Sequence, residues 1–480
     1  MKAALLISGY MRTFNLNLSS IKNVIFSKFD EVDVFLHITK DEEAQDKYMN
    51  ISNQDNLDEI KKALNPKVVL EECNIFFSSN IVPNNIYNMW LKYHKLNLLK
   101  RVYESISKKY DVVIKYRPDI NLGSDIDFNL DTNTIYIPSD SKIDSSKLTH
   151  KNDKSACDTF AYGDSNSMDA YFDIYSHLSD LILNHGHVPE TLMYHYLEKI
   201  DVKYREVDIN YSIILSTCNV FAICGDSGSG KTTLGNLLKR YFSGSFMFEC
   251  DRYHKWDRGN ENWKNMTHLD PEANYLAKMN KDIFDLKIRK TIYQVDYNHH
   301  VGKFTEKQRI DSSDNIIVCG LHSLFSDSNV YDLKIFMDTS RDLKYAWKIK
   351  RDTEERGYSV DAVMEKIKSR EGDFQKHILP QRNKSDIIVN FLSNERFDES
   401  NPHNNIGLLL NIIVNKKLDV TNILNDFMRH DINVSVRSDG VFNVMHFSEY
   451  KNCELFNLTN LNNFYDYIIY VILSLNKQDK

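Results

Sequence analysis

The chain has 480 residues, and at roughly 100–200 residues per domain this length predicts about two to four domains. Hydrophobic residues make up 42% and charged residues 26%, a globular composition, and the formal net charge of −7 disfavours a general nucleic-acid binder. No apolar run approaches the ~20 residues of a membrane helix, so we expect no membrane span. The seven scattered cysteines contain no C-x-x-C pair; they indicate neither a disulfide framework nor a zinc site and favour a cytoplasmic location.

The first 215 residues alternate short apolar runs with a helical stretch. Residues 3–8, 32–38 and 111–115 are predicted strands, and residues 86–110 a predicted helix. The apolar start lacks a cleavage pattern, so we interpret it as a first buried strand and not as a signal peptide. Pro118 has no N–H to donate, so the third strand should end there and Asp119 should lie on the following loop. This pattern predicts an open α/β sheet, in which ligands bind at the carboxyl ends of strands.

A second strand–loop–helix unit begins at Asn219. The pattern predicts strands over 220–224, 316–319 and 333–337, and helices over 231–241 and 342–356. The last ~80 residues predict a smaller mixed unit with strands near 432–436 and 441–446 and a closing helix over 461–475. We therefore expect an α/β protein with three parts, 1–215, 216–400 and 401–480, the last being a small α+β unit of the second.

The loop over residues 225–232, with the sequence Gly-Asp-Ser-Gly-Ser-Gly-Lys-Thr, fits G-x-x-x-x-G-K-[ST] in full. In such a loop backbone N–H groups surround the phosphates of ATP, Lys231 reaches the β- and γ-phosphates, and the Thr232 hydroxyl binds Mg²⁺. The positive end of the following helix adds to the attraction. The expected cofactor-binding residues are Gly225, Asp226, Ser227, Gly228, Ser229, Gly230, Lys231, Thr232 and Thr233.

Asp251 follows what should be the second strand of this unit, where a carboxylate can act as the general base that phosphoryl transfer needs. His254 and Arg258 can hold an anionic substrate. For Asp251 alone, a helix cap or turn residue is the competing interpretation.

Lys344, Lys348 and Arg351 fall at i, i+4 and i+7, so they share one helix face. Cations at this spacing can neutralise phosphoryl oxygens in the transition state. The alternative for an isolated helix is a solvated basic stripe.

Residues 219–395, and more weakly the tail to about 478, resemble phosphoribulokinase within the wider uridine kinase-like group of P-loop kinases. The matching residues occur in the family's order, and they are residues 225–232, Asp251, Tyr253, His254, Asp257, Arg258, Leu269, Asp270, Pro271, Ala273, Asn274, Tyr297, Asn298, His299, Gly320, Leu321, His322, 346–352, Glu355, Arg356, Gly357, Leu379, Pro380 and Gln381.

This resemblance implies ATP-dependent phosphorylation of a hydroxyl on a small sugar-like substrate. Carried over by position, it makes Asp251 the base and, with Thr232, a metal ligand, and it places Lys348 and Arg351 on a lid helix. Lys231, Lys348 and Arg351 join Asp251 as catalytic residues. The predicted substrate site consists of His254, Arg258, Tyr297, His299 and His322. The acceptor stays open among sugars, sugar phosphates and nucleosides.

Two positions depart from the family pattern. Cys319 stands where the family has Glu before Gly-Leu-His, and a thiol is a poor ligand for Mg²⁺, which prefers hard oxygen. The departure leaves open a slowed enzyme, a metal shell completed by Asp251 and water, or a regulatory module that only binds nucleotide. Ser229 stands where plant-type members carry a regulatory cysteine, so that form of thiol regulation is not expected.

Residues 1–212 resemble a glycosyltransferase-like family associated with surface polysaccharide synthesis. The matching segments are residues 4–14, residues 33–37, residues 116–119 and residues 158–163. The resemblance implies a GT-A-like domain, a nucleotide-sugar donor and often a divalent metal. It makes Asp119 a metal or donor ligand, Arg12 a diphosphate contact, and Asp158 or Glu190 an acceptor base.

Other interpretations of this half stay open. A D-x-D pair is absent at Asp119, and Asp125-x-Asp127 is better explained as a solvated loop. Gly9 and Arg12 also fit a simple turn and a surface pair.

Taken together, the sequence predicts a fusion of a glycosyltransferase and a sugar kinase that serve one pathway, such as glycan assembly. We expect a small-molecule sugar, sugar-phosphate or nucleoside acceptor and no nucleic-acid partner. The sequence leaves open whether the chain forms a homo-oligomer.

Overall fold

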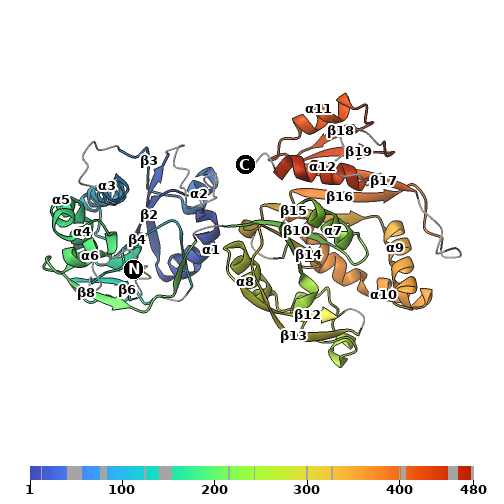
Figure 1. Cartoon of the computed structure of the whole chain (residues 1–480), viewed down its shortest axis with the longest axis horizontal. Helices are drawn as coiled ribbons and strands as arrows, with labels where there is room; N and C mark the ends of the chain where they lie inside the picture. Colours follow the sequence, from blue (N-terminus) through green and yellow to red (C-terminus); the bar gives the residue numbers. More distant parts are fainter. Residues whose placement is uncertain are drawn as a thin grey trace. The chain divides into compact units, whose positions relative to one another are not determined.

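The computed structural model describes residues 1–11, 13–40, 57–75, 84–123, 126–139, 154–214, 217–242, 244–298, 301–325, 328–398, 401, 407–451 and 463–476. The chain divides into two compact units, Met1–Ser216 and Thr217–Lys480, and each contains its own large sheet (Figure 1). Within these ranges no helix is both long and apolar enough to cross a membrane.

The N-terminal unit is built on a seven-stranded sheet with the order β3-β2-β1-β4-β7-β6-β8. Strands β1 to β4 run parallel, whereas β7 runs antiparallel to both β4 and β6. The short strands β5 and β9 pair separately. The strands are β1 (Lys2–Gly9), β2 (Glu31–Thr39), β3 (Val68–Glu72), β4 (Val112–Tyr116), β5 (Ile120–Leu122), β6 (Thr134–Pro138), β7 (Phe160–Gly163), β8 (Lys203–Val207) and β9 (Tyr211–Ile213).

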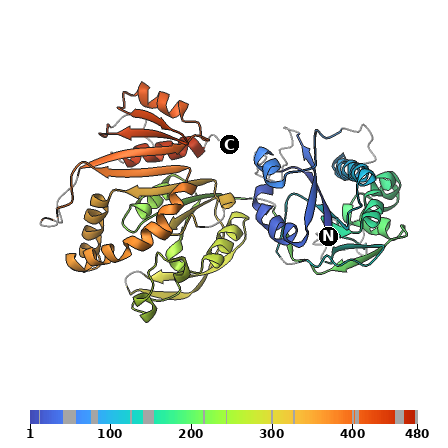
Figure 2. The same ribbon diagram turned by 180° about the vertical axis from the view of Figure 1, so that it is seen from behind.

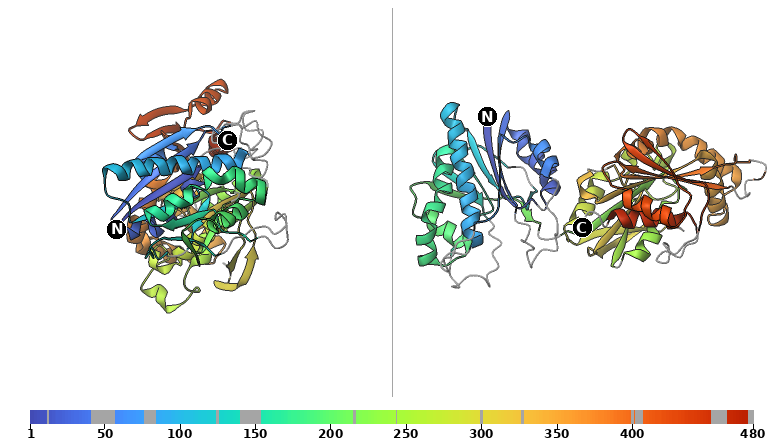
Figure 3. Two further views of the ribbon diagram at one scale, coloured as in Figure 1. Left: turned by 90° about the vertical axis from the view of Figure 1, so that its left-hand side faces the viewer. Right: turned by 90° about the horizontal axis from the view of Figure 1, so that it is seen from above.

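Helices cover both faces of this sheet, as Figure 3 shows. Alternate residues of β1 enter two separate cores: Leu5 packs with helices α1 and α2, and Leu6 packs with α3 to α6. A strand buried on both faces must be apolar throughout, which explains the continuous apolar run at the start of the chain. The helices are α1 (Phe14–Val24), α2 (Leu57–Leu64), α3 (Asn84–Ile106), α4 (Ser165–Phe172), α5 (Ile174–His185) and α6 (Pro189–Leu197).

The C-terminal unit contains an eight-stranded sheet with the order β11-β14-β10-β15-β16-β17-β19-β18. Its first five strands are parallel and its last three are antiparallel, so the chain after residue 401 extends the same sheet. Strands β12 and β13 form a separate antiparallel pair. The strands are β10 (Asn219–Gly225), β11 (Ser245–Glu249), β12 (Ile292–Asn298), β13 (Lys303–Ile310), β14 (Asn315–Gly320), β15 (Leu333–Thr339), β16 (Ile387–Ser393), β17 (Leu408–Asn415), β18 (Ser435–Asp439) and β19 (Phe442–Phe447).

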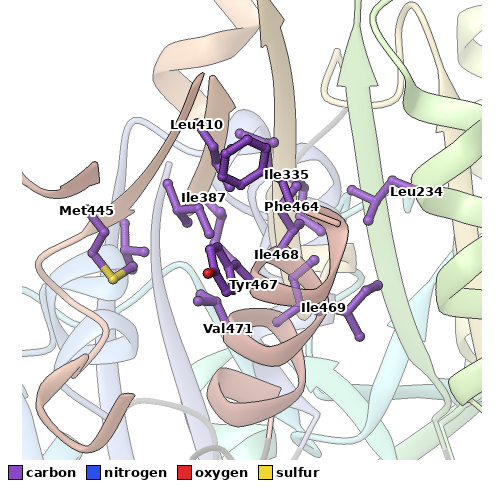
Figure 4. Packing of buried hydrophobic residues seen from close by; sticks show 14 of the residues in the cluster. Leu234, Ile335, Ile387, Leu410, Met445, Phe464, Tyr467, Ile468, Ile469 and Val471 are labelled. Carbon is purple, nitrogen blue, oxygen red and sulfur yellow. The ribbon is translucent and has the colours of Figure 1, made fainter. Parts of the chain in front are cut away.

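One face of this sheet packs against α7, α11 and α12, and the opposite face packs against α8. Figure 4 shows Tyr467, Ile468 and Val471 of α12 lying among side chains of β15, β16, β17 and β19. Helices α9 and α10, orange in Figure 2, pack against each other through a small apolar cluster of their own. The helices are α7 (Lys231–Tyr241), α8 (Leu276–Lys287), α9 (Arg341–Glu354), α10 (Val360–Asp373), α11 (Thr421–Arg429) and α12 (Tyr465–Asn476).

Two predicted elements differ from the structure. The strand expected near 432–436 begins at Ser435, because Asp431 adopts φ +50 after α11 and Ile432 packs into the core before the strand starts. The helix expected over 86–110 ends at Ile106, and the Glu104 carboxylate then accepts a hydrogen bond from the Tyr110 backbone N–H.

Candidate active site

The phosphate loop connects the end of β10 to the start of α7 and turns on glycines. Gly225, Gly228 and Gly230 have φ values of +148°, +85° and +89°, a region that favours glycine. A Cβ at Gly225 would lie 2.5 Å from the carbonyl oxygen of Met337, and one at Gly230 would lie 2.7 Å from the Tyr465 hydroxyl. The motif's glycines are therefore required both by backbone conformation and by close neighbours.

The loop carries several hydrogen-bond donors. The Lys231 ammonium folds back and donates to the Asp226 carbonyl oxygen at 2.5 Å, while the first N–H groups of α7 have no partners within the helix. The Ser229 hydroxyl is buried and has no hydrogen-bond partner within the described part of the chain. Backbone and side-chain donors of this kind form a cradle for phosphate groups.

Helix α9 places three cations against this loop. Lys344 Nζ lies 2.8 Å from Asp226 Oδ2, and Arg351 Nη2 lies 3.5 Å from Ser227 Oγ. Lys348 packs on Gly228, because a Cβ added at Gly228 would lie 3.2 Å from the Cβ of Lys348. Lys344 and Lys348 are buried, so the face they share is directed at the phosphate loop and is not the solvated basic stripe of the alternative interpretation.

The pKa of the Lys348 ammonium is lowered to about 8. Burial is the main cause; Arg370 and Arg351 also lower the pKa, whereas Asp226 and Asp352 raise it. Burial also lowers the pKa of Arg370, which lies on α10. Arg370 was not among the predicted site residues, because its position near the loop depends on how α10 packs against α9.

Asp251 lies on the 3-10 turn that follows β11, and it is adjacent to a positioned histidine. His254 Nε2 lies 3.7 Å from Asp251 Oδ1, and His254 Nδ1 lies 2.7 Å from Asn274 Oδ1. The Asn274 amide nitrogen donates to the carbonyl oxygens of Asp270 and His268, at 2.8 and 3.2 Å. Its oxygen must therefore accept from His254 Nδ1–H, which leaves Nε2 facing Asp251. Asn274 is one of the residues that match the family, but the sequence did not predict that it orients His254.

The remaining predicted substrate residues lie around His254. Tyr297, on β12, is hydrogen-bonded to Arg258, and its ring centroid lies 6.3 Å from that of His254. His322 Nε2 lies 3.2 Å from the His268 carbonyl oxygen, and burial lowers the pKa of His322 to about 4, so this imidazole is neutral. His299 lies outside the described residues.

The donors available for a divalent metal are the Thr232 hydroxyl and carboxylates at the ends of β11 and its turn. The Cys319 thiol is 7% exposed and hydrogen-bonded to Thr232, and burial raises its pKa to about 12. A neutral thiol does not suit Mg²⁺, whereas the oxygen donors do. No cluster of three His, Cys, Asp or Glu side chains suited to a metal occurs in the residues that the structure places, so Mg²⁺ here would also need phosphate oxygens of the nucleotide.

In the N-terminal unit, Asp119 and Asp158 share one polar cluster at the carboxyl end of β4. Arg117 donates to both oxygens of Asp119, at 2.6 and 3.0 Å, and both carboxylates act on the partly buried guanidinium. Lys115 is fully buried and donates to the Asp158 carbonyl oxygen, and burial lowers its pKa to about 8. Sequence reasoning missed the buried Lys115, which the regular apolar run of β4 concealed.

The other candidates of this unit are less clearly placed. The Glu190 carbonyl oxygen accepts from the Ala156 backbone N–H, two residues from Asp158, so α6 borders the same segment. Arg12 lies outside the described residues.

A glycine-rich phosphate loop between a central parallel strand and a helix, faced by cations of a second helix, defines the C-terminal unit as a P-loop kinase fold. The model of the phosphoribulokinase / uridine kinase family matches residues 220–397. The chain belongs to this family. It is 32% identical over 183 residues to a uridine kinase of Ligilactobacillus salivarius, a match that covers 35% of this chain and 84% of that protein.

Two further comparisons describe the relationship to phosphoribulokinases. The phosphoribulokinase of Synechocystis sp. is 32% identical over 177 residues, covering 36% of this chain and 53% of that protein, so the chain spans about half the length of this relative. The solved phosphoribulokinase from Rhodobacter spheroides aligns with a TM-score of 0.42 and 20% identity, covering 55% of this chain and 98% of that one. The family model leaves residues 1–219 unmatched, so the glycosyltransferase resemblance remains a prediction.

Proposed function

We propose that the C-terminal unit transfers the γ-phosphoryl group of ATP to a hydroxyl of a small sugar-like acceptor. One observation carries this proposal: the Cys319 thiol, at the end of β14, lies within electrostatic reach of both the Lys231 ammonium and the Asp251 carboxylate. The residue that would hold phosphates and the residue that would accept a proton therefore lie on either side of one thiol at the carboxyl end of β14. In-line attack requires that these two groups be near each other.

The steps follow from the residues around this space. Asp251 accepts the proton of the attacking hydroxyl, and His254, oriented by Asn274, borders that carboxylate. Lys231, Lys348 and Arg351 stabilise the charge that develops on the transferred group. Thr232 and Asp251 would hold Mg²⁺, which would neutralise part of the charge of the nucleotide phosphates.

An anionic acceptor is favoured over a neutral one. Arg370 and Arg258 both act electrostatically on Lys366 of α10. Lys366 and Arg370 also act on His268, whose ring stacks on that of His254. Cations from two separate segments thus lie near His254. A sugar phosphate would add a negative charge that these cations can bind, whereas a nucleoside would not.

The proposal is tested by measuring ADP release from Mg-ATP with pentose phosphates, other sugar phosphates and nucleosides as acceptors. Turnover should appear with a sugar phosphate, and Asp251→Asn should lower kcat by about 10²–10⁴-fold. Asp311→Asn, an exposed aspartate of the same unit, is the matched control and should leave kcat unchanged. ATP binding without turnover on any acceptor would favour the alternative, a nucleotide-binding regulatory module.

For the N-terminal unit we propose nucleotide-sugar binding by a glycosyltransferase-like domain. The supporting observation is the polar cluster of Arg117, Asp119, Lys115 and Asp158 at the carboxyl end of β4, the edge at which α/β sheets bind ligands. Titration with a panel of nucleotide-sugars, with Mn²⁺ present and absent, should detect binding that Asp119→Asn weakens. Binding of none of them by the intact chain would exclude this function.

A further inference from the structure

Glu249 is the last residue of β11 and lies beside Cys319 in the sheet. Strands β11 and β14 are parallel neighbours, and their register pairs Glu249 with Cys319. Residues paired in register on adjacent strands direct their side chains to the same face. The carboxylate of Glu249 and the thiol of Cys319 are therefore side-by-side at the edge where the phosphate loop lies.

The side chains of Glu249 and Cys319 lie on the face of the sheet that α7 covers. Met247, two residues before Glu249, packs into the core on the α7 side, and its sulfur would lie 2.8 Å from a Cβ added at Gly235 of that helix. Ile317, two residues before Cys319, enters the same core, whereas Phe248 and Val318 enter the opposite one. Because α7 begins at Lys231 and Thr232, both side chains point toward the start of the phosphate-binding helix.

The electrostatics of Cys319 agree with this placement. Thr232 is hydrogen-bonded to the thiol, and the carboxylates of Asp251 and Glu249 are both near enough to interact with it. Two carboxylates and one hydroxyl thus surround a thiol that cannot itself bind a hard cation. These oxygens are the donor set that Mg²⁺ prefers.

Glu249 is held in place but keeps a free oxygen. Arg252 Nε and Nη2 lie 3.3 and 3.1 Å from Glu249 Oε2, and Arg252 also contacts Asp296 Oδ1 at 3.2 Å. Glu249 Oε1 accepts no hydrogen bond from any residue that the structure describes. The side chain is 34% exposed, so its free oxygen is open to a solvated ion.

We propose that Glu249 supplies, from the neighbouring strand, the carboxylate that the metal site lacks at Cys319. With this residue the site gains a second carboxylate, beside that of Asp251, which acts directly or through one water, while Arg252 fixes the other oxygen of Glu249. The role rests on the proposed kinase function, because the metal would arrive with the nucleotide. Cys319 takes no part in metal binding.

The test measures Mn²⁺ binding to the ADP complex of the full chain by electron paramagnetic resonance, which does not depend on turnover. Glu249→Gln should weaken Mn²⁺ binding about 10–100-fold. Cys319→Glu, added to Glu249→Gln, should restore most of the loss, because it returns a carboxylate to the adjacent position. Glu306→Gln, an exposed glutamate on β13, is the matched control and should leave Mn²⁺ binding unchanged.

The outcomes separate this inference from the kinase proposal. Metal-free ADP affinity, measured by calorimetry, should be equal in wild type and Glu249→Gln, and its absence in wild type would overturn the kinase proposal. Retained ADP binding with Mn²⁺ affinity unchanged in Glu249→Gln would overturn the role of Glu249 alone. Loss of Mn²⁺ binding in Cys319→Ser would also overturn the role of Glu249, because the thiol would then be the ligand.

If Glu249→Gln does not fold, Glu249→Asp tests the same role. The displaced carboxylate should weaken Mn²⁺ binding, and unchanged binding would contradict the proposal.

Discussion

Lys344 Nζ lies 2.8 Å from Asp226 Oδ2, and this largely buried ion pair joins helix α9 to the second residue of the phosphate loop. A carboxylate inside a loop that binds phosphates would repel them if it were not neutralised. Lys344 therefore supports anion binding indirectly, by cancelling the charge of Asp226, and it also holds the lid helix against the loop.

Lys344→Met should raise the Kd for ATP at least about tenfold, equivalent to about 1.4 kcal/mol, because the Asp226 carboxylate is left unpaired beside the phosphates. Adding Asp226→Asn should recover much of the loss, and titration calorimetry on the four proteins measures the coupling. Lys287→Met removes an ion pair to Asp332, at 2.6 Å, and serves as the control, with lower stability and unchanged affinity expected. Losses that simply add in the double variant would contradict the neutralising role.

Nucleotide binding should take up a proton near pH 8. The pKa of Lys348 is lowered to about 8 in the free protein, mainly by burial, and phosphate groups would raise it on binding. Affinity should therefore be greatest below pH 8 and fall as pH rises above it, where the free protein must first regain a proton. Calorimetry in buffers of different ionisation enthalpy measures the uptake, and Lys348→Arg should abolish it because arginine stays charged.

Gly230→Ala should weaken ATP binding at least about tenfold. The residue has φ +89°, and an added Cβ would lie 2.7 Å from the Tyr465 hydroxyl oxygen, whereas the ring carbon that carries this oxygen is 4.0 Å away. Tyr465→Phe in the same chain should recover part of the loss and leave the cost of the backbone conformation. Gly372→Ala, with no atom within 4 Å of its Cβ, should leave binding unchanged. Failure of Tyr465→Phe to improve Gly230→Ala would show that the backbone conformation alone is responsible.

The N-terminal unit should lose stability in mild acid. His37 is fully buried, and burial, with Lys92 and Lys95 nearby, lowers its pKa from 6.5 to about 4 despite the opposing Glu72. The unfolded chain therefore binds a proton first as pH falls, and stability is lost between pH 6.5 and about 4, by up to about 3 kcal/mol. Calorimetry of His37→Gln should show a flatter pH dependence of this unit's unfolding than wild type. His177→Gln, at an exposed site, should behave as wild type does.

Local elements were the most predictable features. The helix over 231–241 was predicted at its observed bounds, and Asp119 lies on the loop after β4, because glycine and proline constrain their own backbone and apolar spacing marks buried faces. The strand near 432–436 was misplaced, because a tight turn and a core contact at Ile432 delay the strand, and periodicity alone does not show either.

The sequence by itself determined the phosphate loop, the aspartate after the second strand and the spacing of the lid cations, because each depends on neighbours a few residues away. Only the tertiary structure decided which distant residues meet them: Lys344 with Asp226, Glu249 with Cys319, and Tyr465 with Gly230. Strand order and register arise from packing of whole layers against one another. A shift of one residue in the register of β11 would turn Glu249 to the opposite face of the sheet. No local sequence pattern shows which of the two registers the strand adopts.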